Sequence, residues 1–441
     1  MTKLILFILL VQNISYAQPK AWETDATPLH RAQKALTDVV VHDIFSPPVA
    51  SRIYAYTNIA AYEILVKKYP GYKSLNKQLN SYPEMPVAPG KICASLAAVN
   101  AFLAVAKGLV FSEAILQDST DHILLWYKNK KISKATYDAS LQYGKQVAVA
   151  VMRWAAMDKY KETRSLRRYN YLKKEGKWIP TPPVYMAAVE PYWNRIRSMA
   201  LDSSSQFRPV PALTFSTDKT SPFYAQALEV YDIGQHLSPE NKAVANFWDC
   251  NPFAVSTEGH LNFAIKKISP GGHWMSIAGI ACRNTVADIT RSAAAYTLTA
   301  IALFDGFIIC WDEKYRSNLI RPETFINKYI DEGWRPLLQT PPFPEYSSGH
   351  SVISTVAAGV LTHLFGDQVG FDDDTEVEFG IPVKHFASFT DACNEAAISR
   401  LYGGIHYRAA IETGQQQGKD LGNWIKGKIQ LKGAAAPGRD F

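Results

Sequence analysis

Two pairs of residues have the types and spacing to bind a tetrahedral oxyanion. Lys314 stands seven residues before Arg321, and Arg400 stands six residues before His406. The planar guanidinium of arginine donates two parallel hydrogen bonds to such an anion, and lysine adds a point charge. A lone Lys–Arg pair is more often part of a salt-bridged helix surface. The prediction of a binding site therefore depends on a third stretch.

The third stretch is Ser348-Gly349-His350, which supplies a hydroxyl, a glycine that lets the backbone approach a ligand, and an imidazole. The apolar residues after it recur at helical spacing, so we expect these three residues at a helix N-terminus. Unpaired N–H groups and the helix dipole favour an anion there. The apolar residues are Val352, Ile353, Val356, Ala357, Val360 and Leu361.

The spacing also predicts which elements carry the two pairs. Lys314 and Arg321 would share one face of a helix, about 10 Å apart along its axis, and Pro322 would end or bend that helix. Arg400 and His406 cannot share a helical face, because six residues rotate the chain by about 240°. Gly403-Gly404 is expected to end one helix and to leave His406 near the start of the next.

Together the three stretches form a trap for an oxyanion. When a tetrahedral oxyanion becomes trigonal bipyramidal, the lysine and the two arginines would neutralise the charge on its equatorial oxygens. The serine hydroxyl and the glycine N–H would donate further hydrogen bonds to it. His406 faces the central atom as nucleophile or ligand, and His350 is placed where an acid or base is needed. The seven residues are Lys314, Arg321, Ser348, Gly349, His350, Arg400 and His406.

The composition is that of a large folded protein. The chain has 441 residues, of which 47% are hydrophobic and 20% charged, so it can bury a core in one or two domains and is not a disordered chain. The net charge of +7 suits a small anionic ligand. The basic stretch 161–177 carries no nucleic-acid-binding motif, so we expect a solvated loop and no nucleic-acid partner.

The first 17 residues are typical of a signal peptide. Lys3 precedes the apolar run Leu4 to Val11, and Ser15-Tyr16-Ala17 resembles a cleavage site. We therefore expect an exported protein, periplasmic or secreted. The longest later apolar stretch, 292–311, is interrupted by Asp305 and Gly306, so no membrane span is predicted.

The periodicity predicts a mostly α fold of helical bundles, with the oxyanion site between helices of the C-terminal half. Residues 18–220 form an N-terminal helical region with an irregular Pro-rich segment, and residues 221–441 form the C-terminal helical region that holds all three motifs. The expected helices are 29–45, 50–67, 92–110, 113–127, 133–157, 222–237, 239–248, 275–307 and 407–425.

The cysteines and the acidic run are expected to be structural. The five cysteines are scattered without a CxxC pair, so buried thiols are expected, and metal binding through cysteine is not. An odd count leaves at least one of them free in an exported protein. Asp372-Asp373-Asp374 lacks the ligand spacing of an EF-hand and is expected in a solvated loop.

The three motifs, in this order and with this internal spacing, resemble those of the vanadium-dependent haloperoxidases, which share a superfamily with the type 2 phosphatidic acid phosphatases. The resemblance implies that Lys314, Arg321, Ser348, Gly349 and Arg400 hydrogen-bond vanadate and that His406 is the axial ligand of vanadium. It further implies that His350 is the acid–base residue and that Lys314 polarises the bound peroxide. Phosphate would compete for the same donors. Ser347 departs from the proline often found before Ser-Gly-His in this family.

Two further features favour the bacterial haloperoxidase branch. The lipid phosphatases span membranes several times, and the soluble acid phosphatases are much shorter chains. Trp311, Phe343 and His273 stand where the resemblance implies a pocket for halide and peroxide. The implied function is oxidation of halide, iodide or bromide rather than chloride, by hydrogen peroxide to a hypohalous acid that halogenates a small organic acceptor.

Two alternatives stay open at this point. One is a soluble acid phosphatase that uses His406 as a covalent nucleophile. The other is a non-catalytic oxyanion-binding protein. Whether the chain forms a homo-oligomer is also left open, as are the halide preference and the organic acceptor.

Overall fold

The computed structural model describes residues 20–69, 71–256, 263–264 and 266–432. The predicted signal peptide, residues 1–17, lies outside these residues, so export stays a prediction.

The N-terminal half is helical, as its periodicity predicts. The break expected at Ser46-Pro47-Pro48 separates α2 from α3, and Ser133 caps α6 by accepting a hydrogen bond from the Thr136 N–H at 3.2 Å. The helices are α1 (Ala21–Thr24), α2 (Thr27–His42), α3 (Pro47–Val66), α4 (Ala94–Lys107), α5 (Glu113–Lys128), α6 (Lys134–Ala156) and α7 (Tyr160–Arg164), followed by the short 3-10 helix η1 (Trp193–Arg195).

The C-terminal half is also helical, with two short antiparallel strand pairs among the described residues. Its helices are α8 (Pro222–Gln235), α9 (Pro239–Phe247), α10 (Pro270–Asn284), α11 (Ile289–Ser317), α12 (Pro322–Tyr329), α13 (Gly349–Phe365), α14 (Phe389–Tyr402) and α15 (Arg408–Lys428), with the 3-10 helix η2 (Val377–Phe379). Strand β1 (Val255–Ser256) pairs with β2 (Phe263–Ala264), and β3 (Phe371–Asp373) pairs with β4 (Lys384–Phe386).

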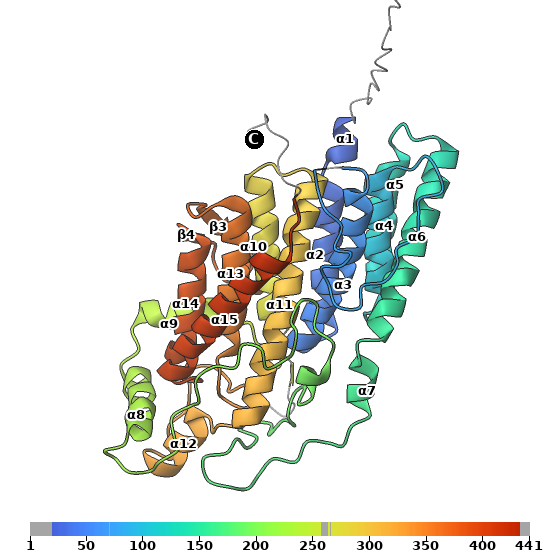
Figure 1. The fold of residues 1–441 in the computed structure, drawn as a ribbon. Coiled ribbons are helices and arrows are strands. Elements are labelled where there is room, and N and C mark those ends of the chain that lie inside the picture. The colour runs from blue at the N-terminus through green and yellow to red at the C-terminus, as the bar shows by residue number, and fades with distance from the viewer. Residues whose placement is uncertain (1–19, 70, 257–262, 265, 433–441) are drawn as a thin grey trace, which may run out of the picture.

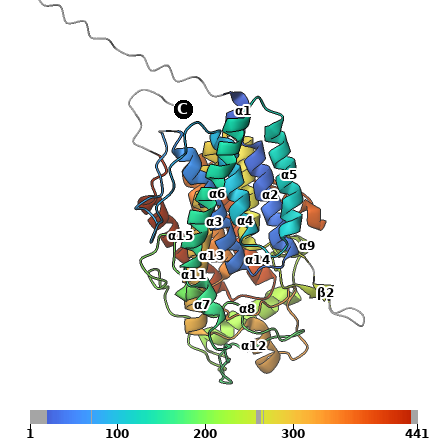
Figure 2. The same cartoon turned by 90° about the vertical axis from the view of Figure 1, so that its right-hand side faces the viewer.

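Helix α11 is the centre of the fold. It packs against α3 of the N-terminal half and against α10, α13 and α15 of the C-terminal half. Figures 1 and 2 show the N-terminal helices α2 to α6 on one side of it and the later helices on the other, with α8 and α12 near the lower end. One continuous apolar core therefore joins the two halves.

Among the described residues, α11 alone is long and apolar enough to cross a membrane, and its apolar window is wholly buried in the protein. Asp305 interrupts that window and accepts hydrogen bonds from the backbone N–H groups of Met199 and Ala200, each at 2.7 Å. A helix covered by protein on all sides has no face left for lipid, so α11 serves here as a core helix.

One expected helix is two helices. The stretch 275–307 was expected to be continuous, but α10 ends at Asn284 and α11 begins at Ile289. Asp288 caps α11 by accepting a hydrogen bond from the Arg291 N–H at 2.8 Å. The apolar periodicity continues through both helices, so it does not indicate the break that Asp288 makes as the N-cap of α11.

Two glycines bring α15 unusually close to α13. A Cβ atom added to Gly418 would lie 2.6 Å from the carbonyl oxygen of Val352, and one added to Gly414 would lie 2.8 Å from that of Ser348. Glycine is required at both positions because any side chain would meet backbone. The contact fixes the start of α13, where Ser348 and Gly349 lie.

Gly418→Ala should lower the free energy of unfolding by about 1–3 kcal/mol, because the methyl group overpacks the contact between the two helices. Gly427→Ala on the same helix is the matched control, since a Cβ there meets nothing within 4 Å. It should raise stability slightly, by up to about 1 kcal/mol. Urea unfolding curves of both variants check this, and equal shifts would contradict the close-packing argument.

Candidate active site

The predicted site residues come from the ends of four helices and from one turn. Lys314 lies in the last turn of α11, Ser348 caps α13, Arg400 lies in the last turn of α14, and Arg321 precedes α12. His406 lies in the turn between α14 and α15. Helix ends bring both unpaired N–H groups and unpaired carbonyls to one place, which suits a site that must hold cations and an anion together.

The expected placement of Lys314 and Arg321 on one helical face is wrong. Helix α11 ends at Ser317, because Asn318 takes a left-handed conformation with φ of 51°. Arg321 is instead the residue before Pro322 at the start of α12. The two cations still meet, because the chain turns back between the two helices.

The expectation for Arg400 and His406 is confirmed. Helix α14 ends at Tyr402, Gly404 has a positive φ of 74°, and α15 begins at Arg408. The double glycine thus turns the chain, so that both side chains reach the same pocket.

A small pocket lies between these elements. Gly349, His350, Arg400 and His406 line its polar side. Lys314, Arg321 and Ser348 are fully buried behind that side. The remaining lining residues are mostly apolar: Pro47, Cys250, Asn251, Pro252, Phe253, Pro270, Phe307, Trp311, Pro341, Phe343 and Ile405.

Three buried nitrogen atoms at the site have no hydrogen-bond partner among the described residues. Two of them, Nη2 of Arg321 and Nε of Arg400, are donors, and the third is Nε2 of the neutral His350. Native proteins rarely leave buried donors unpaired, and the first N–H groups of α13 add donors of the same kind. The donor set therefore fits a tetrahedral oxyanion such as vanadate.

His406 presents one nitrogen to this donor set. Arginine can only donate, so Nε2 of His406 accepts the 3.1 Å hydrogen bond from Nη1 of Arg321 and carries no proton. The other nitrogen, Nδ1, donates to Oε1 of Glu345 at 2.8 Å. Burial and the charges of Arg321 and Lys314 hold the pKa of His406 well below its usual value. The neutral imidazole keeps a lone pair at Nε2, as a metal ligand or a nucleophile requires.

Glu345 is a site residue that sequence reasoning missed. Besides the His406 ring, its Oε1 accepts a hydrogen bond from the Tyr407 N–H at 3.0 Å. The residue is fully buried, and burial raises the pKa of its carboxyl group to about 7, against the opposing charges of Arg321 and Lys314. A carboxylate three residues before Ser348, in an otherwise apolar and aromatic stretch, was the available signal.

Lys314 has no free N–H group in this structure. Its ammonium donates to the carbonyl oxygens of Pro344, Glu345 and Ser347 at 3.1, 3.0 and 2.6 Å. Burial lowers the pKa of Lys314 to about 7. The family resemblance implies a direct hydrogen bond from Lys314 to the oxyanion. To make it, Lys314 would have to give up its hydrogen bond to one of these carbonyl groups. The positive charge of Lys314 acts at the site without that bond.

Ser348 and Gly349 take the positions expected of them at the start of α13. The Oγ atom of Ser348 accepts the N–H of Ser351 at 3.4 Å, which leaves its hydroxyl proton free to donate elsewhere. A Cβ added to Gly349 would meet only Trp311 at 3.7 Å and Lys314 at 3.9 Å, both ordinary contacts. The protein itself therefore tolerates a methyl group there, and the glycine keeps space open beside the pocket.

Trp311 and Phe343 both line the pocket, with ring centroids 4.9 Å apart. The Phe343 ring also lies 5.1 Å from the Lys314 ammonium and 5.1 Å from the Arg321 guanidinium. The two aromatic rings thus form the wall beside the cations, and Phe343 contributes cation–π attraction to them.

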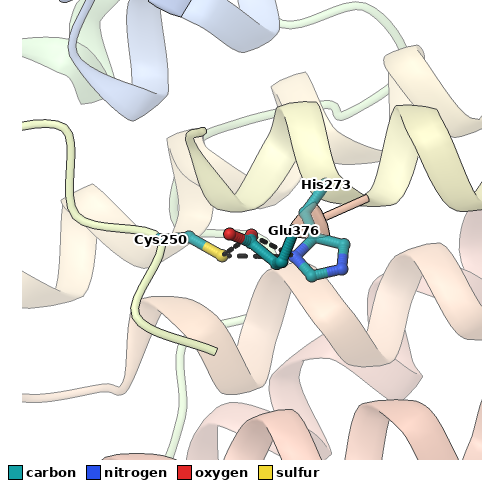
Figure 3. Close-up of side chains that lie close together, drawn as sticks. All are labelled: Cys250, His273 and Glu376. Carbon is teal, nitrogen blue, oxygen red and sulfur yellow. Dashed lines mark hydrogen bonds and ion pairs between the residues drawn. The ribbon is translucent and has the colours of Figure 1, made fainter. Parts of the chain in front are cut away.

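His273 does not line the pocket, which corrects the expectation for this residue. It is fully buried beside Cys250 (Figure 3). Its Nε2 contacts Oδ2 of Asp373 at 2.8 Å. The pairing also corrects the prediction of a solvated loop at 372–374, because Asp373 is fully buried in β3.

Comparisons with known proteins give four findings. A family model for the VCPO second helical-bundle domain matches residues 328–432. The crystal structure of a bacterial vanadium-dependent iodoperoxidase is 46% identical, with a TM-score of 0.88, over 95% of this chain and 99% of that one. The holo form of a bacterial vanadium-dependent chloroperoxidase is 17% identical, with a TM-score of 0.65, over 88% of this chain and 93% of that one, which is a likeness of fold alone. No curated protein matches the chain.

Glu345→Gln should weaken vanadate binding by about 10–100-fold, because a neutral amide makes the His406 imidazole a poorer ligand. Phosphate binding, which needs no bond to His406, should be kept or strengthened, since a negative charge is lost nearby. Calorimetric titration of both anions measures the difference. An equal loss for both would mean that Glu345 only holds the turn at Tyr407.

Oxyanion binding should weaken as pH rises above about 7. The ammonium of Lys314 and a protonated Glu345 both favour an anion, and each loses its proton as pH rises through a pKa of about 7. Sulfate, whose own charge is constant in this range, should lose affinity by up to about tenfold per pH unit per group. In the Lys314→Arg variant the side chain stays charged, so the contribution of Lys314 to the pH dependence of sulfate affinity should disappear. Glu345→Gln should remove the contribution of Glu345. A wild-type affinity that is constant from pH 7 to 9 would contradict this linkage.

Proposed function

The chain belongs to the vanadium-dependent haloperoxidase family, and we propose that this enzyme oxidises iodide or bromide, in preference to chloride, with hydrogen peroxide. Its cofactor is vanadate. The proposal depends on the unprotonated Nε2 of His406. Arg321 holds this nitrogen beside buried donors that have no partner, in a pocket that is otherwise mostly apolar.

The residues of the polar side hold the cofactor. His406 provides the nitrogen ligand, and Arg321, Arg400 and the N-terminus of α13 balance the negative charge of the oxygens. Vanadate, once bound, supplies a Lewis acid that activates hydrogen peroxide toward halide. Lys314 adds a positive charge that its three carbonyl partners hold in place.

His350 moves the proton. Its Nε2 is buried without a partner, and the residue lines the pocket. Burial and the charge of Arg400 hold the pKa of His350 well below its usual value, so the free imidazole is neutral and accepts a proton from peroxide. In the overall reaction, halide loses two electrons and the O–O bond breaks. One oxygen leaves in the hypohalous acid, and the other leaves as water after it takes up a proton.

The apolar wall supports the halide preference. Trp311, Phe343 and Phe253 line the pocket, and the first two lie beside the cations. An ion that enters such a pocket loses hydration, and the loss costs less for large, weakly hydrated iodide than for chloride. The similarity to a bacterial iodoperoxidase over 95% of the chain is consistent with this order. The hypohalous acid would then halogenate a small organic acceptor.

The test is halide oxidation by the purified chain preincubated with orthovanadate, in the presence of hydrogen peroxide and iodide, bromide or chloride. Turnover should require vanadate and follow the order iodide, bromide, chloride. His406→Ala should reduce it by at least about 100-fold, because the ligand to vanadium is lost. His363→Ala, an exposed histidine on α13, is the matched control and should keep full activity.

A parallel assay separates the phosphatase alternative. The chain without vanadate is incubated with p-nitrophenyl phosphate. Phosphate release that vanadate inhibits, without halide turnover, would overturn the proposal and make His406 a covalent nucleophile. Turnover of chloride faster than iodide would keep the haloperoxidase and overturn the preference.

A further inference from the structure

A second group of ligand-type side chains lies directly behind the pocket wall. Cys250, His273 and Glu376 are all buried, and their ligand atoms point toward one another (Figure 3). Across the described part of the chain, this is the one set of His, Cys, Asp or Glu side chains that brings three ligand atoms within 4.8 Å of one another. No step of the proposed halide oxidation uses these three side chains, although Cys250 lies in the pocket lining.

We propose that Cys250, His273 and Glu376 bind a divalent metal ion of the zinc class, separate from vanadium, that holds one wall of the active-site pocket in place. Three distances carry the proposal. Sγ of Cys250 lies 3.3 Å from Nδ1 of His273, Nδ1 lies 3.2 Å from Oε1 of Glu376, and Sγ lies 3.8 Å from Oε1.

These distances match one face of a tetrahedral zinc site. With bonds of about 2.3 Å to sulfur and about 2.0–2.1 Å to nitrogen and oxygen, tetrahedral geometry separates the ligand atoms by roughly 3.3–3.6 Å. Each of the three observed separations lies within a few tenths of an ångström of that range. Water takes the fourth position. A mixed set of sulfur, nitrogen and oxygen ligands suits zinc better than magnesium or calcium, which take oxygen alone.

The orientation of His273 supports metal binding at Nδ1. Its Nε2 contacts Oδ2 of Asp373 at 2.8 Å, and its ring stacks on Trp248 with centroids 4.7 Å apart at 21°. A carboxylate on the far nitrogen of a histidine fixes the ring and its tautomer and makes the near nitrogen a better ligand. Asp373 therefore acts as the outer partner of the site.

The charges around the group also suit a divalent cation. As ligands, the Cys250 thiolate and Glu376 bring two negative charges, and Asp373 brings a third, in a fully buried place. A divalent cation leaves one negative charge, near Arg400, whose charge acts on Cys250. The competing arrangement is an imidazolium at His273 between two carboxylates, beside a neutral thiol.

The metal would join three regions that are far apart in the sequence. Cys250 follows α9, His273 lies in the first turn of α10, and Glu376 precedes η2. Residues 250–253 line the pocket, and the carbonyl oxygen of Trp248 accepts a hydrogen bond from Nη1 of Arg400 at 2.7 Å. Holding residues 248–253 therefore positions both the pocket wall and Arg400. The three ligands are positioning residues, and Cys250 also contributes to the pocket lining.

The experiment uses the full chain without vanadate, because chelators also remove vanadate. The chain is produced with zinc supplied, freed of loose metal by gel filtration and analysed by mass spectrometry for metal content. We expect one zinc per chain. Replacement by Co²⁺ should produce a thiolate-to-cobalt charge-transfer band and the visible bands of a tetrahedral ion. Removal of the metal by a chelator should lower the melting temperature, and Zn²⁺, but not Mg²⁺, should restore it.

Matched variants assign the site. Cys250→Ser should lose the charge-transfer band and the bound zinc. Cys393→Ser, which removes another buried thiol that donates to the Thr390 carbonyl, should keep both. A band that persists in Cys250→Ser would overturn the assignment. Wild-type chain that holds well under one zinc after zinc is supplied, and that shows no cobalt band, would overturn the site and leave the imidazolium arrangement. Neither readout depends on halide oxidation.

Discussion

The interaction on which the site depends is the burial of positive charge without a carboxylate for each cation. Lys314, Arg321 and Arg400 are almost wholly buried. Moving a charge from water into protein is costly unless other groups replace the water. Backbone carbonyls do so for Lys314, and the Phe343 ring and carbonyl do so for Arg321. The N–H groups of Arg321 and Arg400 that have no partner can donate to an anion. Bound vanadate would therefore neutralise positive charge that the folded protein leaves without a carboxylate.

Helix ends provide the carbonyl and N–H groups that replace water around the buried cations. A helix interior offers no free carbonyl or N–H, whereas a loop in solvent would offer water instead. The segment between α12 and α13 supplies carbonyls to Lys314 and carries Glu345, which orients His406, and the N-terminus of α13 faces the pocket. The contact of Gly414 with Ser348 holds that N-terminus against α15. The same short segment thus satisfies the cations, orients the metal ligand and begins the anion-binding helix.

The pocket wall formed by residues 250–253 is built in a different way. Residues 248–253 have no helix or strand of their own, yet they supply pocket lining and the carbonyl partner of Arg400. A segment without secondary structure needs side-chain contacts with the rest of the fold to keep its position. The group formed by Cys250, His273 and Glu376 provides them, since it joins this segment to α10 and to the residues after β3. Catalytic precision would then depend on a second inorganic centre that takes no part in the reaction.

The sequence alone determined what depends on near neighbours, and tertiary packing decided the rest. Ser348 at a helix start and the turn at Gly403-Gly404 follow from capping and backbone freedom within a few residues. The position of Arg321 was missed because the left-handed Asn318 ends α11 inside a pattern that still looks helical. Glu345 with His406, and His273 with Asp373, join residues 61 and 100 positions apart, respectively. No local spacing encodes such pairs, because they form only when separate helices pack and exclude water, and burial then makes each polar partner necessary.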